Sequence, residues 1–299
     1  MRTRWRALIS AFAALAATTM TTPAHRADAA PPLFACSGSP RDFNVDKKAD
    51  VYGFDRSARI WLMRGTGSAS APFSHRIAAQ DQGTWDHHDN FTYVGRTRNW
   101  PCAVYARDTT NGTLEAFEPD RYGRVHAFWS SINMRAYSMF TGVGDLTGSG
   151  YGDMLARDKA GALWLFRGEN GPDYWDVFKP PLRVPGTWKS VTALVGAGDV
   201  TGDGRPDLLA RDGTGVLRLY PGTGQATKPF GPAVRLGGDW KWATAFIGAG
   251  DYTGDGRPDL LARDGTGRVW LSPGRLSSAA PFGGRTVVGT GWGAYTFLF

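Results

Sequence analysis

The sequence predicts an all-β protein, a β-propeller of five four-stranded blades closed by the C-terminal strand. Three observations lead to this prediction. An acidic, glycine-rich loop recurs at a nearly fixed period along the chain. Each period holds short runs of strand-forming residues separated by Gly and Pro. No segment keeps a helical hydrophobic period, so the content of each unit is that of a propeller blade.

The loops start near residues 42, 95, 145, 199 and 251, at spacings of 53, 50, 54 and 52 residues. Residues 198–212 recur almost unchanged at 250–264, and a looser copy occupies 144–158. A fainter copy begins at Asp42, and an Ala-Arg-Asp sequence at 106–108 marks a degenerate copy whose loop is 95–103. A fixed period of about 50 residues is typical of propellers and arrays.

The fourth unit illustrates the strands that we expect in each blade. They are 192–195 before the acidic loop, 207–210 after it, 216–220 beyond a tight Asp-Gly-Thr-Gly turn, and 233–236 after a second turn. The last segment, Trp292 to Phe299, is predicted as a strand with no acidic loop after it. Placed beside the first blade, it would close the ring and leave no free edge. Residues 33–37 compete for the same place, and a linear solenoid is the alternative architecture.

Residues 1–29 have the order of a secretory signal peptide, which leaves 30–299 as the propeller. Arg2, Arg4 and Arg6 precede the uncharged apolar stretch 7–17, and a small-residue cleavage site follows at 27–29. Eleven apolar residues are too few to span a bilayer. We therefore expect a secreted, extracellular monomer without membrane insertion. Removing the signal lowers the formal net charge from +7 to +4 and leaves no basic cluster, which argues against nucleic acid as a partner.

The two cysteines, Cys36 and Cys102, are predicted to form a disulfide. In an oxidising compartment an even pair more often forms a bond than stays free. The closed loop would stabilise the fold by about 4 kcal/mol through the lost entropy of the unfolded chain.

Oxygen-bearing side chains recur at positions 1, 3, 5 and 9 of the acidic loops, and position 7 can add a backbone carbonyl. The predicted ligands are Asp42, Asn44, Asp46, Lys48 and Asp50; Asp145, Thr147, Ser149, Tyr151 and Asp153; Asp199, Thr201, Asp203, Arg205 and Asp207; and Asp251, Thr253, Asp255, Arg257 and Asp259. Such hard oxygen donors suit Ca²⁺, whereas Zn²⁺ prefers His or Cys. Crowded carboxylates also repel one another without a cation.

The alternative is that these loops are plain turns, since Asp, Gly and Thr favour turns in any case. We expect two to four structural Ca²⁺ sites, and none in the loop from Gly95, which has Arg96 and Arg98 instead of acids. The sequence Gly-Asp-Val-Thr-Gly-Asp-Gly-Arg-Pro-Asp-Leu-Leu at 198–209 resembles the FG-GAP/VCBS repeat of integrin α propellers. That resemblance implies an extracellular, Ca²⁺-stiffened propeller used for adhesion or recognition, sugar binding included.

Two classes of function remain. Trp61, Trp164 and Trp270 share the centre of the third strand, where other units carry Glu115 and Arg218, so they are candidate exposed platforms for a ligand. Packing between blades is the alternative for these tryptophans.

The His-rich sequence Asp86-His87-His88-Asp89 could hold a metal or a general base, but such a cluster is more often a solvated turn or strand end. No known catalytic motif occurs. We therefore predict no enzyme but a recognition module for a carbohydrate or cell-surface ligand. A protein-binding subunit of a secreted complex is the alternative, and a hydrolase a more distant one.

Overall fold

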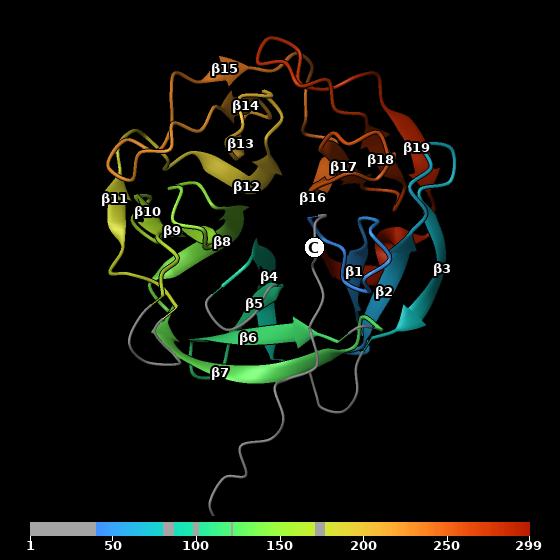
Figure 1. Ribbon diagram of the computed structural model, residues 1–299, viewed down its shortest axis with the longest axis horizontal. Coiled ribbons are helices and arrows are strands. Elements are labelled where there is room, and N and C mark those ends of the chain that lie inside the picture. The colour runs from blue at the N-terminus through green and yellow to red at the C-terminus, as the bar shows by residue number, and fades with distance from the viewer. Residues whose placement is uncertain (1–39, 80–86, 98–101, 121, 171–176) are drawn as a thin grey trace, which may run out of the picture. The chain divides into compact units, whose positions relative to one another are not determined.

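The computed structural model describes residues 40–79, 87–97, 102–120, 122–170 and 177–299, with only the backbone described at 126–131. In these residues the chain forms five antiparallel four-stranded sheets arranged in a ring (Figure 1). This confirms the predicted five-bladed propeller. The signal peptide and the competing segment 33–37 lie outside the described residues. Within the described part of the chain, no helix is both long and apolar enough to cross a bilayer.

Each blade is a meander that runs from the ring axis outward. Blade 1 holds β20 (Tyr295–Leu298), β1 (Val51–Asp55), β2 (Ile60–Gly65) and β3 (Phe73–Ala78). Blade 2 holds β4 (His88–Gly95), β5 (Ala103–Asp108), β6 (Thr113–Pro119) and β7 (Val125–Asn133). Blade 3 holds β8 (Tyr137–Gly144), β9 (Asp153–Asp158), β10 (Leu163–Phe166) and β11 (Leu182–Val184). Blade 4 holds β12 (Val191–Gly198), β13 (Asp207–Asp212), β14 (Leu217–Tyr220) and β15 (Val234–Arg235). Blade 5 holds β16 (Ala243–Gly250), β17 (Asp259–Asp264), β18 (Val269–Ser272) and β19 (Thr286–Gly289).

The ring closes in blade 1, as predicted, because β20 pairs antiparallel with β1. Phe299 extends the pairing, since its N–H donates to the Tyr52 carbonyl (3.0 Å) and its carbonyl accepts from the Tyr52 N–H (2.8 Å). One detail of the prediction is wrong. Trp292–Ala294 forms a short 3-10 helix η1 rather than the start of the strand, and it begins after Gly291 in the left-handed conformation (φ 77°).

Buried apolar side chains pack between neighbouring sheets. Near the ring axis, however, the inner strands of neighbouring blades lie so close together at Gly142 and Gly196 that no side chain fits there. A Cβ atom on Gly142 would lie 2.0 Å from the Tyr93 carbonyl oxygen of blade 2. A Cβ on Gly196 would lie 2.1 Å from the Gly142 oxygen of blade 3. Only glycine fits at such a contact, which explains part of the unusual glycine content.

The recurring Ala-Arg-Asp sequence joins blades 2, 3, 4 and 5 each to the following blade. The guanidinium of Arg157 in β9 donates to the Lys189 carbonyl (3.2 Å) and the Val191 carbonyl of blade 4. Its counterparts are Arg107, which reaches Met134 and Tyr137; Arg211, which reaches Trp240 and Ala243; and Arg263, which reaches Trp292 and Tyr295. The repeated Arg is therefore a structural element, as its recurrence in successive units indicated.

Glu118 in β6 gives the fold a dependence on pH that can be measured. Its side chain is 2 % exposed, its Oε1 has no hydrogen-bond partner in the described residues, and burial raises its pKa to about 8. A raised pKa means that the stability it contributes is complete below its unfolded pKa of 4.5 and is lost as pH rises through about 8. We expect Glu118→Gln to flatten this loss and to raise the free energy of unfolding at pH 9 by at least about 1 kcal/mol. Denaturant unfolding at pH 5, 7 and 9 checks this.

Glu169→Gln, which removes a half-exposed carboxylate beside Lys179 (3.8 Å), is the control and should leave the pH profile unchanged. An identical pH profile for Glu118→Gln and the parent protein would contradict the prediction.

Candidate calcium-binding loops and comparison with known proteins

The four acidic loops share one backbone shape, which places positions 4 and 6 in the left-handed region. In three loops glycine fills both positions: Gly148 and Gly150, Gly202 and Gly204, and Gly254 and Gly256, with φ between 72° and 84°. In the first loop Val45 (φ 64°) and Lys47 (φ 65°) adopt the same conformation although it is strained for side-chain-bearing residues. The faint first copy is thus a true member of the set.

The aspartate at position 9 of each loop is fully buried and is held by backbone N–H groups from two directions. The Oδ2 atom of Asp207 accepts from Val200 (3.0 Å) and Thr201 (2.9 Å) within its own loop. Its Oδ1 atom accepts from Gly222 (2.9 Å), just beyond the third strand of the blade. The equivalent pairs are Asp50 with Gly65, Asp153 with Gly168, and Asp259 with Gly274. This link to the third strand was not predicted from the sequence. The glycine that stands 15 residues after each position-9 aspartate was the pattern that could have revealed it.

The aspartate at position 1 organises the loop itself. Asp199 accepts from Gly202 (2.7 Å) and Asp203 (3.0 Å) at Oδ1 and from Gly204 (2.8 Å) at Oδ2. Asp251 repeats these bonds in the fifth blade. Backbone amides therefore offset much of the negative charge that the sequence places in each loop, and the argument that crowded carboxylates require a cation loses weight.

Burial raises the pKa of the position-9 carboxyls, to about 8 for Asp50 and about 6 for Asp153 and Asp207. The pKa of Asp259 is raised for the same reason, and the charge of the position-5 carboxylate adds to it. The backbone N–H donors act in the opposite direction. A cation in the loop would favour the ionised form of these groups.

The donor chemistry of the loops fits a hard cation, although the side chains are not gathered around one point. No group of three or more His, Cys, Asp or Glu side chains in the described residues is arranged to hold a metal ion. In the fifth blade, however, the buried Thr253 hydroxyl at position 3 lies beside the Asp259 carboxylate at position 9, whose pKa it lowers, and it has no other hydrogen-bond partner in the described part of the chain. Two neighbouring oxygens at predicted ligand positions suit a cation.

The degenerate second loop differs from the others. Gly95 is left-handed (φ 96°), and the Arg96 carbonyl accepts from Gly152 of blade 3 (2.6 Å). The Arg96 guanidinium lies 5.8 Å from the centre of the Tyr151 ring. Arg98 lies outside the described residues. The described half of this loop therefore contacts the next blade.

The three tryptophans of the third strands are half-buried, and each donates its indole N–H to the aspartate of the preceding turn. Trp61 donates to Asp55 (2.8 Å), and Trp164 and Trp270 donate likewise to Asp158 and Asp264 (2.8 and 2.9 Å). Arg218 makes the same bond to Asp212 in blade 4 (2.6 Å), which explains why Trp and Arg alternate there. The Trp61 ring lies under the guanidinium groups of Arg59 (5.2 Å) and Arg76 (4.3 Å).

Two expectations about blade 2 are wrong. Glu115 is buried, not exposed, and its Oε2 lies 2.8 Å from Nε2 of His88, which is also buried. His88 is therefore no solvated strand end, although it does begin β4. Asp89 forms a two-pronged ion pair with Arg107 (2.8 and 2.6 Å). His88 is thus engaged by Glu115 and Asp89 by Arg107, both within blade 2. Asp86 lies outside the described residues.

Cys102 is fully buried and is not a free thiol. Its predicted partner Cys36 lies outside the described residues, so the disulfide between them stays a prediction.

Comparison with known families agrees with the repeat seen in the structure. Residues 145–210 and 199–262 match the family of FG-GAP-like repeats. These repeats span the acidic loops of blades 3, 4 and 5, and propellers built from FG-GAP repeats are typically binding modules of the recognition or adhesion type rather than enzymes.

No curated protein matches the sequence. Among solved structures, similar chains occur in two crystals of BBS1N in complex with ARL6DN, one soaked with mercury and one with lead. The first is 11 % identical with a TM-score of 0.37, and the alignment covers 80 % of this chain and 66 % of the other. The second is 12 % identical with a TM-score of 0.34, covering 74 % and 60 %. This chain thus spans less than two thirds of those proteins.

Proposed function

We propose that this protein is a secreted, calcium-binding β-propeller that recognises a carbohydrate or another cell-surface ligand. The observation that carries the proposal is the loop set: four loops keep the same left-handed backbone and carry side-chain oxygens at the same four positions. Ca²⁺ would be held by the side-chain oxygens at positions 1, 3, 5 and 9 and by the position-7 carbonyl. Its role is structural, since these donors fill most of a six- to eight-oxygen shell.

Calcium is expected to raise the thermal stability of the purified protein, and a chelator to lower it. At a tenfold excess over Kd, each occupied site adds about 1.4 kcal/mol to the free energy of unfolding. Melting curves in 5 mM Ca²⁺, 5 mM Mg²⁺ and EDTA measure the effect. Mg²⁺ is the control for ionic strength and for a divalent charge that does not suit the loops. Asp203→Asn and Asp255→Asn together should reduce the Ca²⁺-dependent shift, because both residues lie exposed at position 5 and support little else in the loop.

Equal melting temperatures in Ca²⁺ and EDTA would refute the calcium part of the proposal. The recognition part is tested separately by a glycan array probed in millimolar Ca²⁺, with a chelator control. Specific signals that become weaker in the Trp61→Ala, Trp164→Ala or Trp270→Ala variant would support these rings as ligand platforms. A blank array with folded protein would favour the second candidate, a protein partner in a secreted complex.

A further inference from the structure

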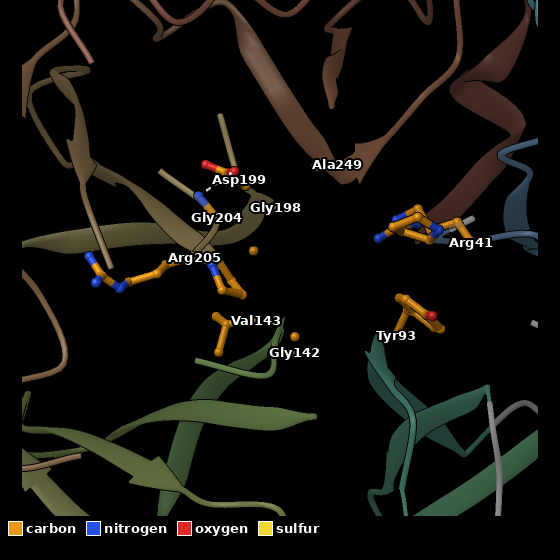
Figure 2. Close-up of a pocket in the computed structure, with 13 residues that line it drawn as sticks. Arg41, Tyr93, Gly142, Val143, Gly198, Asp199, Gly204, Arg205 and Ala249 are labelled. Atoms are coloured by element: carbon orange, nitrogen blue, oxygen red, sulfur yellow. Dashed lines mark hydrogen bonds between the residues drawn. The ribbon is translucent and has the colours of Figure 1, made fainter. Parts of the chain in front are cut away.

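A cavity of about 240 Å³ lies near the ring axis, where the inner strands of blades 2, 3 and 4 face one another. Gly142 lines one side, and Tyr93, at the equivalent place in β4, lies across from it (Figure 2). Gly196, at the same place in β12, also lines the cavity. An adjoining cavity of about 400 Å³ shares the lining residues Pro40, Gly198, Asp199 and Ala249. Backbone dominates these walls, so few side chains determine what the space could bind.

Arg41 is the cationic side chain buried at this cavity. It occupies the position directly before the first acidic loop, where blades 3, 4 and 5 have Gly144, Gly198 and Gly250. Its backbone has the left-handed conformation of Gly144 and Gly198 (φ 68°, against 74° and 66°). Its carbonyl accepts from the Asp50 N–H (2.9 Å), as a residue at the end of an inner strand does. A strained, long, charged residue thus stands where the repeat otherwise uses glycine.

Arg41 is only 6 % exposed, and its Nη1 atom has no hydrogen-bond partner in the described residues. Nη2 lies against Gly248, where a Cβ would be only 2.7 Å away, and Cζ lies 5.8 Å from the centre of the Tyr93 ring. Burial raises the pKa of nearby Tyr252 to about 12, and both the positive charge of Arg41 and its side-chain hydrogen bond to the Tyr252 hydroxyl act against that rise. No carboxylate of the described chain forms an ion pair with Arg41.

A buried guanidinium that has no carboxylate partner is unfavourable unless an anion joins it, and its planar fork matches a carboxylate. Figure 2 shows the guanidinium directed across the cavity toward Gly142, Gly198 and Asp199. Asp199 Oδ1 accepts two backbone N–H bonds and Oδ2 accepts one, which reduces their repulsion of an anion and leaves Oδ2 able to accept from a hydroxyl group. The cavity therefore presents the buried Arg41 guanidinium and the exposed Arg205 together with a hydroxyl acceptor, the polarity of a site for an anion that carries hydroxyls.

We propose that the axial cavity is a binding site for a small acidic sugar, whose carboxylate pairs with the Arg41 guanidinium. The choice of a sugar rests on the proposed recognition function, whereas the anion site rests on Arg41 alone. Glucuronate is a probe of the right chemistry, and glucose is its matched neutral control. The volume is below the roughly 300–1,000 Å³ of sites for drug-sized ligands, which favours a single sugar ring over a longer chain.

The test is isothermal titration of the full chain with glucuronate, glucose and inorganic phosphate at constant ionic strength. We expect glucuronate to bind at least tenfold more tightly than glucose, and Arg41→Gln to abolish that preference. Arg56→Gln removes an exposed arginine from the β1–β2 turn of the same blade and should change nothing. Because Arg41→Gln could disturb the loop, Ala249→Leu is the second variant. It fills the cavity while keeping Arg41, and it should also abolish glucuronate binding in a folded protein.

Equal affinity for glucuronate and glucose, unchanged binding by Arg41→Gln, or binding of phosphate without glucuronate would each overturn the acidic-sugar site. The two proposals fail differently. Signals confined to neutral glycans on the array would leave the recognition function standing and remove this site. Arg41-dependent glucuronate binding beside a blank array would support this site and remove the wider glycan function.

Discussion

Replacing Asp207 with alanine is expected to lower the free energy of unfolding by about 3 kcal/mol even in the presence of a chelator. The variant leaves the Thr201 and Gly222 N–H groups without their acceptor in a buried setting, and each such loss costs about 1–3 kcal/mol. It also detaches the loop from the third strand of blade 4. Denaturant unfolding in EDTA, compared with the parent protein, measures the cost.

Asp203→Ala is the matched control for this experiment. Asp203 is exposed at position 5 of the same loop, and its described bonds are to the Arg205 backbone (3.0 Å) and guanidinium (3.5 Å). In EDTA it should cost less than about 1 kcal/mol, the range of surface interactions. In Ca²⁺ both variants should lose part of the calcium-dependent stabilisation. Similar costs for both in EDTA would mean that Asp207 does not anchor the loop.

A chain that ends at Ala294 is expected to lose cooperative folding and to associate. Without β20, the β1 strand would present an unpaired edge, and the buried side chains Tyr295, Leu298 and Phe299 would be missing from two core clusters. Each large side chain removed from a core costs about 2–5 kcal/mol, and their sum approaches the stability of an ordinary domain. Circular dichroism and size-exclusion chromatography would detect the loss of structure and the association that a free edge promotes.

Thr296→Ala is the control, because it keeps the strand and removes one bond from the Thr296 hydroxyl to the Phe54 carbonyl (3.0 Å). It should stay monomeric and lose no more than about 1.5 kcal/mol. A truncated chain that melts cooperatively at the parent temperature would show that closure by β20 does not hold the ring together.

The fold could be predicted from the sequence because the loop period and the turn sequences within each repeat both indicate four-stranded blades. The loop period determined the number of blades, and the Asp-Gly-Thr-Gly turn at 212–215 located the second and third strands within two residues of β13 and β14. The first three residues of the closing segment were predicted wrongly as strand. There, the left-handed Gly291 begins a 3-10 turn, a local effect that the pattern of apolar residues does not reveal.

The site was less predictable, since side-chain partners far apart in sequence determine it. Spacing gave the loop positions, but not that Asp207 bonds to Gly222 or that Glu115 is buried against His88. Glu115 was expected to be exposed because it is charged and stands where other blades have Trp. It is buried instead, because its carboxylate pairs with His88 of the inner strand β4. Arg41 passed unnoticed because its equivalence to the loop-preceding glycines becomes clear only when their backbones are compared.

The Arg bridges between blades also determine where the ring should open first. They join blade 2 to 3, 3 to 4, 4 to 5 and 5 to 1, but in blade 1 the place of the arginine is taken by Phe54. The junction of blades 1 and 2 has stacked rings at that level instead, Phe54 on Phe91 (5.2 Å) and Phe91 on Phe299 (4.9 Å). Farther out, the Tyr52 hydroxyl donates to the Gly123 carbonyl (2.8 Å) and the Val125 N–H to the Ala79 carbonyl (2.8 Å). Apolar attraction weakens on cooling, whereas hydrogen bonds do not share that dependence. The propeller therefore has a seam of different thermodynamic character, and the amide hydrogens of β1 and β4 should gain exchange rate in the cold relative to those of β12 and β16.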